Sequence, residues 1–444
     1  MYDAIYIERM GKPVATFVFE PFYNDAMSAA SSKGMPVIRV VPEQIVSEST
    51  VVNDIRYAIH SVADDMIAVL TGPLTEDEIS PRRREPENPP RITFKGNLEE
   101  VNRFFYQRGW TDGLPVIPPT EAAVAEMLTG TDLPPDHLVE TLVPRLGKAT
   151  VETIAVNAVM AGCLPTHMPV LIAGVHALTG SASCDMMAAS TGSFSPFWLI
   201  NGPVAKEINV RSTYGATSPG DIANAAIGRA MGLITKNIRG IRKQVEDMGV
   251  LGNPGKYSWV AAEAEDESPW PPFHLSHGFA AEDSTVTLTF PQSYQQLMPF
   301  GTDDKGLLGT VMGHIGISSL GNLVVLLTPT NARSLADRGW TKQQVMDYIV
   351  ENTILPEDYF QRLGLADMEN APERGLGTAW SRKVFRRSPS DPSPVHIFVY
   401  GGFGSWVGLA YGGPAPITRK IELPANWDSL VKKYRNVVPN YLLY

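Results

Sequence analysis

Residues 263–279, EAEDESPWPPFHLSHGF, hold the densest group of side chains that could transfer protons. Glu263 and Glu265 follow the run YSWVAA (257–262), whose aromatic and β-branched composition predicts a short strand. Alternate residues of a strand point to the same side, so the two carboxylates would share one face at the strand end. Two carboxylates in different environments can divide the roles of acid and base. We therefore expect Glu263 and Glu265 to be catalytic.

Two histidines follow in the same stretch, beyond the proline-rich segment PWPP (269–272). A rigid turn there would let His274 fold back toward the two acids, which makes it a third catalytic candidate. His274, His277 and one carboxylate could also bind a metal ion, since imidazole and carboxylate are common ligands. The spacing H-x-x-H outside a helix is not diagnostic, so we assign no metal ligands, and the sequence does not identify a cofactor. A solvated acidic loop is the remaining alternative.

The stretch RGWTDGLPVIPPT (108–120) predicts a tight turn at the end of a helix, held by the prolines that follow. Trp110 on this turn is a candidate for substrate binding, and Asp112 is a secondary catalytic candidate. The alternative is an Asx turn, in which the carboxylate of Asp112 accepts a hydrogen bond from its own backbone.

The stretch INGPVAKEINV (200–210) follows an apolar run and turns sharply at its Asn-Gly-Pro sequence. Asn201, Lys206 and Asn209 could donate hydrogen bonds to a carboxylate or carbonyl oxygen of a substrate. Lys206 could equally form a solvated pair with the neighbouring Glu207.

The stretch GGFGSW (401–406) follows a predicted strand and forms a glycine loop. It lacks the full G-x-G-x-x-G motif in a β-α-β context and the Gly-Lys-Ser/Thr of a Walker A loop, which argues against nucleotide binding. We expect Gly402, Gly404 and Trp406 to line a substrate pocket.

The chain contains two cysteines, Cys163 and Cys184, too few for a disulfide framework or a four-cysteine metal site. Cys163 and His167 could form a nucleophile pair, but Pro165 between them disturbs the helical alignment that would bring them together. A buried core cysteine is the alternative, because free cysteines are usually buried.

The composition excludes several functional classes. The 444 residues carry a net charge of −10, with 44% apolar and 19% charged residues, which is typical of a globular protein that does not bind nucleic acid. The chain begins without a signal-peptide pattern, and its most apolar window, 168–178, is far shorter than the roughly 20 residues of a membrane span. We expect a soluble, cytoplasmic protein without membrane contact.

The chain divides into three parts. Residues 1–72 predict a small α/β domain with a parallel sheet, from strands at 14–19 and 36–41, a helix between them and a helix over 49–72. Residues 73–91 are charged and proline-rich and form a linker. Residues 92–444 form a large mixed α/β (α+β) domain without a recognisable internal repeat. Helices are expected at 97–108, 120–129, 150–162, 168–178, 221–235, 331–338, 341–352 and 427–435, and strands at 284–290, 322–328, 395–400 and 417–422.

Several of these stretches together resemble a known family. RGWTDGLPVIPPT, INGPVAKEINV, NPGKYSWVAAEAEDESPW, RGWTKQQVMDYIVENT and GGFGS with ITRKIELP are similar to the large C-terminal region of the UGSC-motif (seleno)protein family. GKPVATFVFEPFYNDAMSAASSKGMPVIRVV resembles the second half of that family's small N-terminal domain. The family is named for a selenocysteine or cysteine followed by Gly-Ser-Cys, a motif that this chain lacks, so no residue here inherits thiol or selenol chemistry.

Three hypotheses follow. The leading one is an enzyme, a hydrolase or lyase, that acts by acid/base chemistry in the large domain on a small polar metabolite, which we expect to be anionic. The second, which the resemblance implies, is a non-catalytic or co-catalytic subunit whose N-terminal sheet is completed by a small motif-bearing partner or by a homo-oligomer. The third is a metal-dependent hydrolase that uses His274 and His277.

Overall fold

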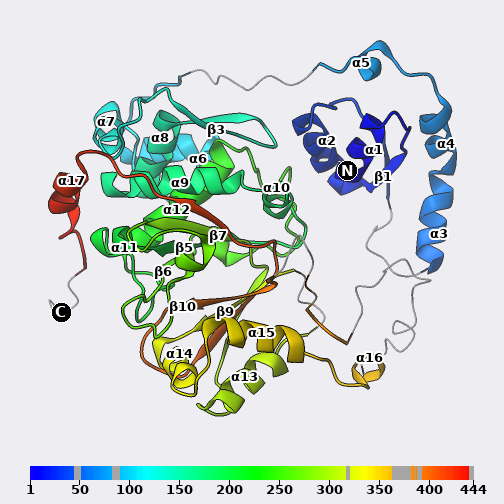
Figure 1. Cartoon of the computed structure of the whole chain (residues 1–444). Coiled ribbons are helices and arrows are strands. Elements are labelled where there is room, and N and C mark those ends of the chain that lie inside the picture. Colours follow the sequence, from blue (N-terminus) through cyan, green and yellow to red (C-terminus); the bar gives the residue numbers. More distant parts are fainter. Residues whose placement is uncertain are drawn as a thin grey trace.

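A computed structural model describes residues 1–44, 52–82, 91–316, 321–362, 382–385, 387 and 393–439. The fold is mixed α/β, as the sequence predicts. Figure 1 shows the N-terminal segments, up to α5 (Glu76–Ile79), lying beside a larger body.

The N-terminal segments contain the expected two-stranded parallel sheet. β1 (Thr16–Phe19) pairs with β2 (Val40–Glu43), and α2 (Tyr23–Ser32) connects them. A small apolar cluster that includes Ile5 and Ile38 packs beneath this sheet. The helix expected over 49–72 is two helices in the described residues, separated at Val62. These two helices are α3 (Val52–Ser61) and α4 (Ala63–Thr71). A further helix, α1 (Tyr2–Arg9), precedes the sheet.

Two four-stranded sheets form the centre of the larger body. The first sheet has the order β12-β7-β5-β6 and the second β10-β9-β11-β8. The strands of the first sheet are β5 (Phe197–Asn201), β6 (Val260–Ala262), β7 (Thr285–Thr289) and β12 (Ile417–Lys420). Those of the second are β8 (Ser293–Leu297), β9 (Leu323–Leu327), β10 (Val395–Val399) and β11 (Val407–Tyr411).

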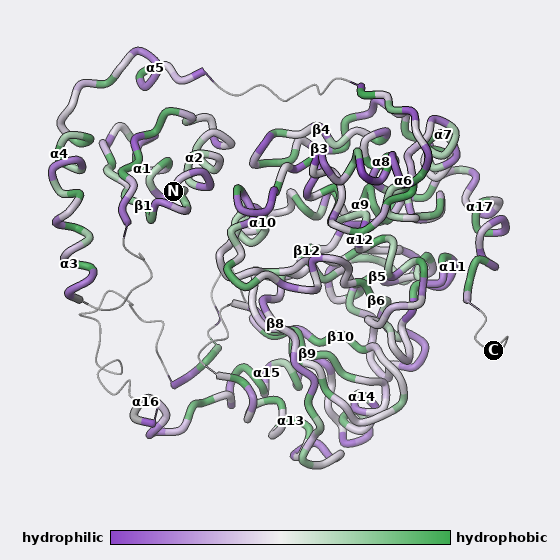
Figure 2. Tube along the Cα trace, turned by 180° about the vertical axis from the view of Figure 1, so that it is seen from behind, coloured by the Kyte–Doolittle hydropathy of each residue, from purple (hydrophilic) through white to green (hydrophobic). Residues whose placement is uncertain are grey.

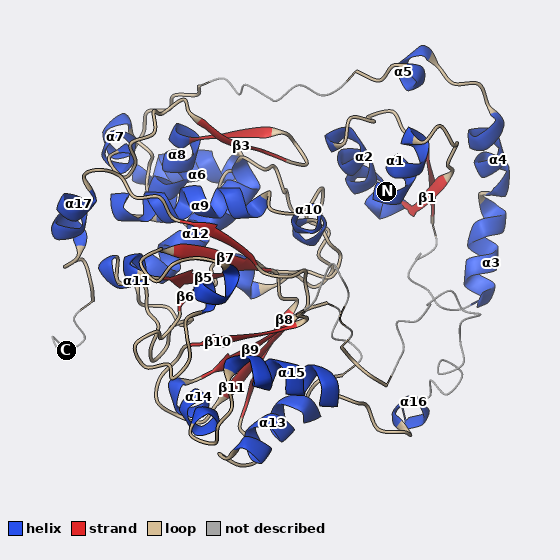
Figure 3. Cartoon of the chain, viewed as in Figure 1, coloured by secondary structure: helices blue, strands red, loops and turns tan. Residues whose placement is uncertain are grey.

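The two sheets pack face to face between two layers of helices. Alternate residues of the strands divide between the faces, so Phe197 and Leu199 join Leu326 and Phe398 in a cluster shared by both sheets. The opposite face of the first sheet carries Trp198 and packs against α8, α9 and α12. The outer face of the second sheet packs against α13, α14 and α15. Figures 1 and 3 show this order of helix, sheet, sheet and helix, and Figure 2 shows hydrophobic residues concentrated along these layers.

Every helix that the sequence predicts in the larger body is present, with its ends shifted by a few residues. The structure also contains several helices that were not predicted. The predicted ones are α6 (Leu98–Gln107), α7 (Glu121–Leu128), α8 (Val151–Ala161), α9 (Met168–Leu178), α12 (Ile222–Asn237), α14 (Pro329–Ala336), α15 (Lys342–Asn352) and α17 (Trp427–Tyr434). The unpredicted ones are α10 (Ala182–Ala188), α11 (Pro203–Glu207), α13 (Asp304–Gly313) and α16 (Tyr359–Arg362). A hairpin of β3 (Leu138–Leu142) and β4 (Gly147–Thr150) was also not predicted.

The strand pairing repeats itself in the two sheets. β5 is parallel to β6 and antiparallel to β7, and β9 is likewise parallel to β10 and antiparallel to β11. β7 continues into β8, which pairs with β11, while β11 continues into β12, which pairs with β7. Each repeat therefore contributes its last strand to the sheet of the other. The sequence shows no repeat because the segments between the strands differ in length and content.

Within the described part of the chain, no single helix is both long and apolar enough to cross a membrane. Pro165–Leu178 and Ala182–Ala188, bent by 99°, pass that test only as a pair and only by length and composition.

Candidate active site

The parallel pairing of β5 and β6 positions the central residues of the site. Ile200 lies opposite Ala262, so Asn201 and Glu263 come together where both strands end. The Glu263 N–H continues the ladder by donating to the Ile200 carbonyl at 3.2 Å. The next residue, Ala264, donates its N–H to the Val399 carbonyl of β10 at 2.7 Å. The site therefore lies at the carboxyl ends of parallel strands, where the two sheets meet, a position typical of ligand sites in α/β folds.

Glu263 is a buried carboxylate with hydrogen bonds to both oxygens. Oε2 accepts from Asn201 Nδ2 and from the Phe273 N–H, both at 2.6 Å. Oε1 accepts from Lys342 Nζ at 2.9 Å and from the Val399 N–H at 3.5 Å. Because these donors come from both halves of the fold and the side chain is 0% exposed, Glu263 is held in place and screened from solvent.

Glu265 is more exposed than Glu263, and the described residues donate hydrogen bonds to only one of its two carboxylate oxygens. Its Oε1 accepts from Asn201 Nδ2 at 2.8 Å and from the Gly202 N–H at 2.7 Å. No described residue donates to Oε2, and the side chain is 18% exposed. Gly202 has φ +85°, and a Cβ there would lie 2.3 Å from the Asp283 carbonyl oxygen, so the turn that presents this N–H requires glycine.

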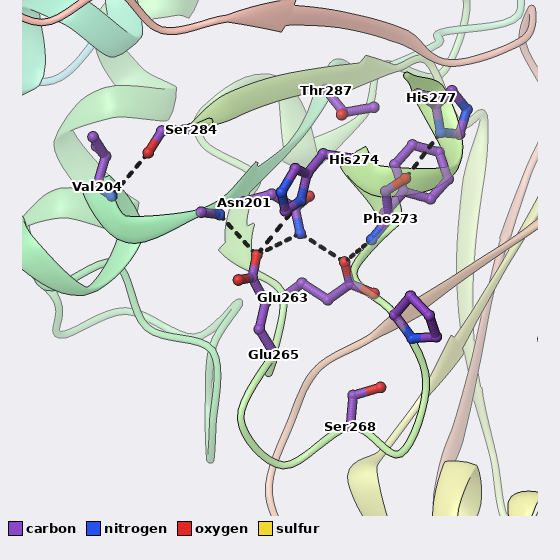
Figure 4. A network of polar contacts seen from close by, with 12 residues as sticks. Asn201, Val204, Glu263, Glu265, Ser268, Phe273, His274, His277, Ser284 and Thr287 are labelled. Carbon is purple, nitrogen blue, oxygen red and sulfur yellow. Dashed lines mark hydrogen bonds and ion pairs between the residues drawn. The ribbon is translucent and has the colours of Figure 1, made fainter. Parts of the chain in front are cut away.

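His274 lies beside Glu265, as Figure 4 shows. Its side chain is 1% exposed, and Nδ1 lies 3.9 Å from Glu265 Oε1. That distance is too long for a hydrogen bond, and neither ring nitrogen has a partner among the described residues. The prediction that the turn returns His274 to the acids is thus confirmed in its geometry.

His277 points away from this cluster. Its Nδ1 lies 3.0 Å from the Phe273 carbonyl oxygen, and its ring packs on the Phe273 ring at 4.0 Å between centroids. Burial lowers the pKa of His277. The described residues contain no group of three or more His, Cys, Asp and Glu side chains arranged to hold a metal ion. His274 and His277 therefore do not form the metal-binding set that their spacing suggested.

Asp112 and Trp110 lie outside this cluster. Both oxygens of Asp112 bind Arg229, at 2.8 and 3.0 Å, and Oδ1 also accepts from the Leu114 N–H at 3.2 Å. Burial opposes ionisation, but Arg229 holds the pKa of Asp112 below its usual value. Trp110 packs edge-on against Phe105. Asp112 thus forms the expected Asx turn and an ion pair with Arg229, and none of its contacts is with Glu263 or Glu265. Its catalytic role stays a prediction.

Lys206 and Asn209 also have other partners. Lys206 Nζ pairs with Asp266 at 2.6 Å, and both side chains are well exposed. Asn209 Nδ2 donates to the Arg435 carbonyl at 2.9 Å. Of the predicted substrate-binding residues in this stretch, only Asn201 contacts the two glutamates.

The glycine loop (401–406) begins close to Glu263, because Val399, just before it, contacts Glu263 and Ala264. The loop residues themselves contact other parts of the chain. The Gly401 N–H donates to the Ser212 carbonyl at 2.7 Å, and Gly402 lies against the Tyr214 ring. The Gly404 N–H donates to Thr330 Oγ1 at 3.1 Å. The Trp406 indole is half-exposed, while its carbonyl accepts from Asn331 Nδ2 at 2.9 Å.

Cys163 is a core residue. Its Sγ donates to the Ala226 carbonyl at 3.3 Å, and burial raises the pKa of the thiol. His167 Nδ1 accepts from the Leu164 N–H at 3.2 Å, and burial lowers the pKa of His167 to about 3. A thiol and an imidazole in these environments stay neutral at pH 7, so the nucleophile-pair alternative is not supported.

Lys342 is the site residue that the sequence did not indicate. It is the first residue of α15, directly after the capping residue Thr341. The segment RGWTKQQ around it predicts a helix start but carries no sign of a partner 79 residues away.

Comparison with known proteins adds no relative: no family model, no curated protein and no solved structure matches the chain.

Proposed function

We propose that the chain is an enzyme that acts on a small polar metabolite by acid/base hydrolytic or lyase chemistry, with Glu265 as the base. The observation that supports this is a partly exposed carboxylate, 3.9 Å from a buried histidine. Within the described residues, one oxygen of this carboxylate and both ring nitrogens of the histidine have no hydrogen-bond partner. A general base must reach the proton that it removes, and Glu265 is the more exposed of the two glutamates.

The proposed roles follow from the contacts. Glu265 takes a proton from an attacking water in hydrolysis, or from a substrate carbon in an elimination. His274 gives a proton to the leaving atom, which receives the electron pair of the bond that breaks. Glu263 and Lys342 are positioning residues, because they orient Asn201, and Asn201 in turn orients Glu265.

A metabolite-depletion screen tests this proposal. The purified chain is incubated with a mixture of polar metabolites, and mass spectrometry identifies any that disappear and the products that appear. Glu265→Gln is expected to abolish the conversion with an unchanged melting temperature. Asp266→Asn is the matched control, because Asp266 is exposed and pairs only with Lys206 among the described residues. Equal conversion by Glu265→Gln and the unaltered chain would refute the role of Glu265.

A second function, a subunit for a small motif-bearing partner, rests on the N-terminal sheet. β1 and β2 form a sheet of two strands, and no third strand pairs with it in the described residues. Two strands alone are marginally stable, so a partner strand would stabilise this unit. Expression in the native host with an affinity tag tests this, since the partner would co-purify in a fixed ratio. A chain that purifies alone and turns over its substrate would count against it.

A further inference from the structure

The charges around Glu265 indicate which ligand the site would hold. We infer that Glu265 binds the ammonium group of a small cationic substrate, an inference that rests on the proposed function of the same carboxylate. Glu263 and Glu265 bring two negative charges together at Asn201, and among the described residues Lys342 pairs with Glu263 at 2.9 Å. Their sum is one unbalanced negative charge, located on the partly exposed Glu265. An anionic ligand would be repelled at this point, whereas an ammonium ion would be attracted.

The other lysines near the site do not change this balance. Lys206 pairs with Asp266 at 2.6 Å, and Lys420 pairs with Asp283 at 2.7 Å. Each of these lysines is thus neutralised by its own carboxylate. The site therefore differs from the anion-binding site that Lys206 and Asn209 suggested in the sequence.

Hydrogen-bond acceptors without donors support the same conclusion. The Asn201 side-chain amide is oriented by its Nδ2, which donates to both glutamates, so Oδ1 is left as a fixed acceptor. Asn201 is 0% exposed, and its Oδ1 has no donor among the described residues. Glu265 Oε2 is a second acceptor to which no described residue donates. An ammonium group has three donors and no acceptor, so it suits a site whose open groups are acceptors.

A binding experiment with simple probes tests the inference without any turnover. Ethylammonium chloride and sodium propionate are titrated into the chain at constant ionic strength, with potassium chloride as a third titrant, and affinity is measured by NMR chemical shifts. Ethylammonium is expected to bind, and Glu265→Gln is expected to weaken its binding at least about tenfold, because a charge-assisted hydrogen bond is lost. Asp266→Asn should bind ethylammonium as the unaltered chain does.

The inference is overturned if propionate binds more tightly than ethylammonium, if potassium produces the same shifts as ethylammonium, or if Glu265→Gln binds ethylammonium unchanged. These outcomes are separable from a failure of the proposed function. If Glu265→Gln abolishes turnover but the chain prefers propionate, the role of Glu265 as a base is supported and the ammonium site is refuted. If the chain binds ethylammonium through Glu265 but converts no metabolite, the ammonium site is supported and the enzymatic function is refuted.

Discussion

Lys342 Nζ lies 2.9 Å from Glu263 Oε1, and this contact joins the two halves of the fold at the candidate site. Lys342 begins α15, which packs on the second sheet, while Glu263 ends β6 of the first sheet. The two side chains are 12% and 0% exposed, so the pair is largely removed from water. A pair in this environment depends on both partners, because either charge alone would be buried without compensation.

Lys342→Met should therefore destabilise the chain by about 3–5 kcal/mol, the usual cost of leaving a buried charge without its partner. Urea unfolding followed by circular dichroism measures the change. The double variant Lys342→Met with Glu263→Gln should recover part of the loss, since no charge is then buried. Lys305→Met, at an exposed lysine, is the control and should change stability little. A loss in Lys342→Met no larger than in this control would contradict the role of the pair.

Gly202→Ala should destabilise the chain and reduce turnover, because a Cβ would lie 2.3 Å from the Asp283 carbonyl oxygen at φ +85°. Gly278→Ala is the comparison, because Gly278 has φ +86° and ψ 12° in the left-handed helical region and no atom within 4 Å of the added Cβ. It measures the cost of that region alone, about 1–2 kcal/mol. Gly202 has ψ −174°, a backbone conformation that is essentially restricted to glycine. Thermal unfolding should show a further loss of about 1–3 kcal/mol in Gly202→Ala from the overlap. Equal losses in both variants would show that the turn has room for a side chain.

Stability should fall as the pH decreases from about 6.5 toward 3, partly through His167 and His396. Burial lowers the pKa of both histidines to about 3, from an ordinary value of 6.5. The unfolded chain binds protons in this interval and the folded chain does not, so stability declines by up to about 1.4 kcal/mol per pH unit for each histidine. Urea unfolding at several pH values measures this slope.

His396→Gln should make that slope shallower while retaining a donor toward Asn322, which His396 Nε2 contacts at 2.9 Å. His60→Gln, at an exposed histidine, should leave the slope unchanged. A slope that is the same in all three proteins would rule out His396 as a contributor.

Both cysteines should be unreactive in the native chain. Cys163 and Cys184 are 8% and 0% exposed, and burial raises the pKa of both thiols. A thiol reagent such as DTNB should label neither in native buffer and both in urea. Rapid labelling of one native thiol would instead indicate an accessible thiolate and would revive a cysteine-based mechanism.

The sequence predicted the elements of strong periodicity, and it predicted the approach of His274 to the acids through a proline-rich turn. It missed β5, β8, β11, the β3–β4 hairpin and the helices α10, α11, α13 and α16. β8 (SYQQL) is mostly polar and exposed, so it lacks the apolar pattern by which a strand is recognised. The sequence placed Glu263 and Glu265 on one face of a strand, whereas β6 ends at Ala262 and both glutamates follow it. Their environments differ because Lys342 and Val399 reach Glu263 from the other half of the fold. Such contacts depend on how the two sheets pack, which no local pattern encodes. The same limit explains Asp112, whose partner Arg229 lies 117 residues away.

The central claim is that Glu265 removes a proton, and chemical rescue of Glu265→Ala tests it most directly. The side chain is partly exposed, so a small carboxylate such as formate can enter the space that the substitution leaves. On the metabolite that the screen identifies, Glu265→Ala should be inactive in the absence of formate. Its rate should rise with formate concentration, while the rate of the unaltered chain stays constant. Turnover by Glu265→Ala at the rate of the unaltered chain, without formate, would contradict the claim.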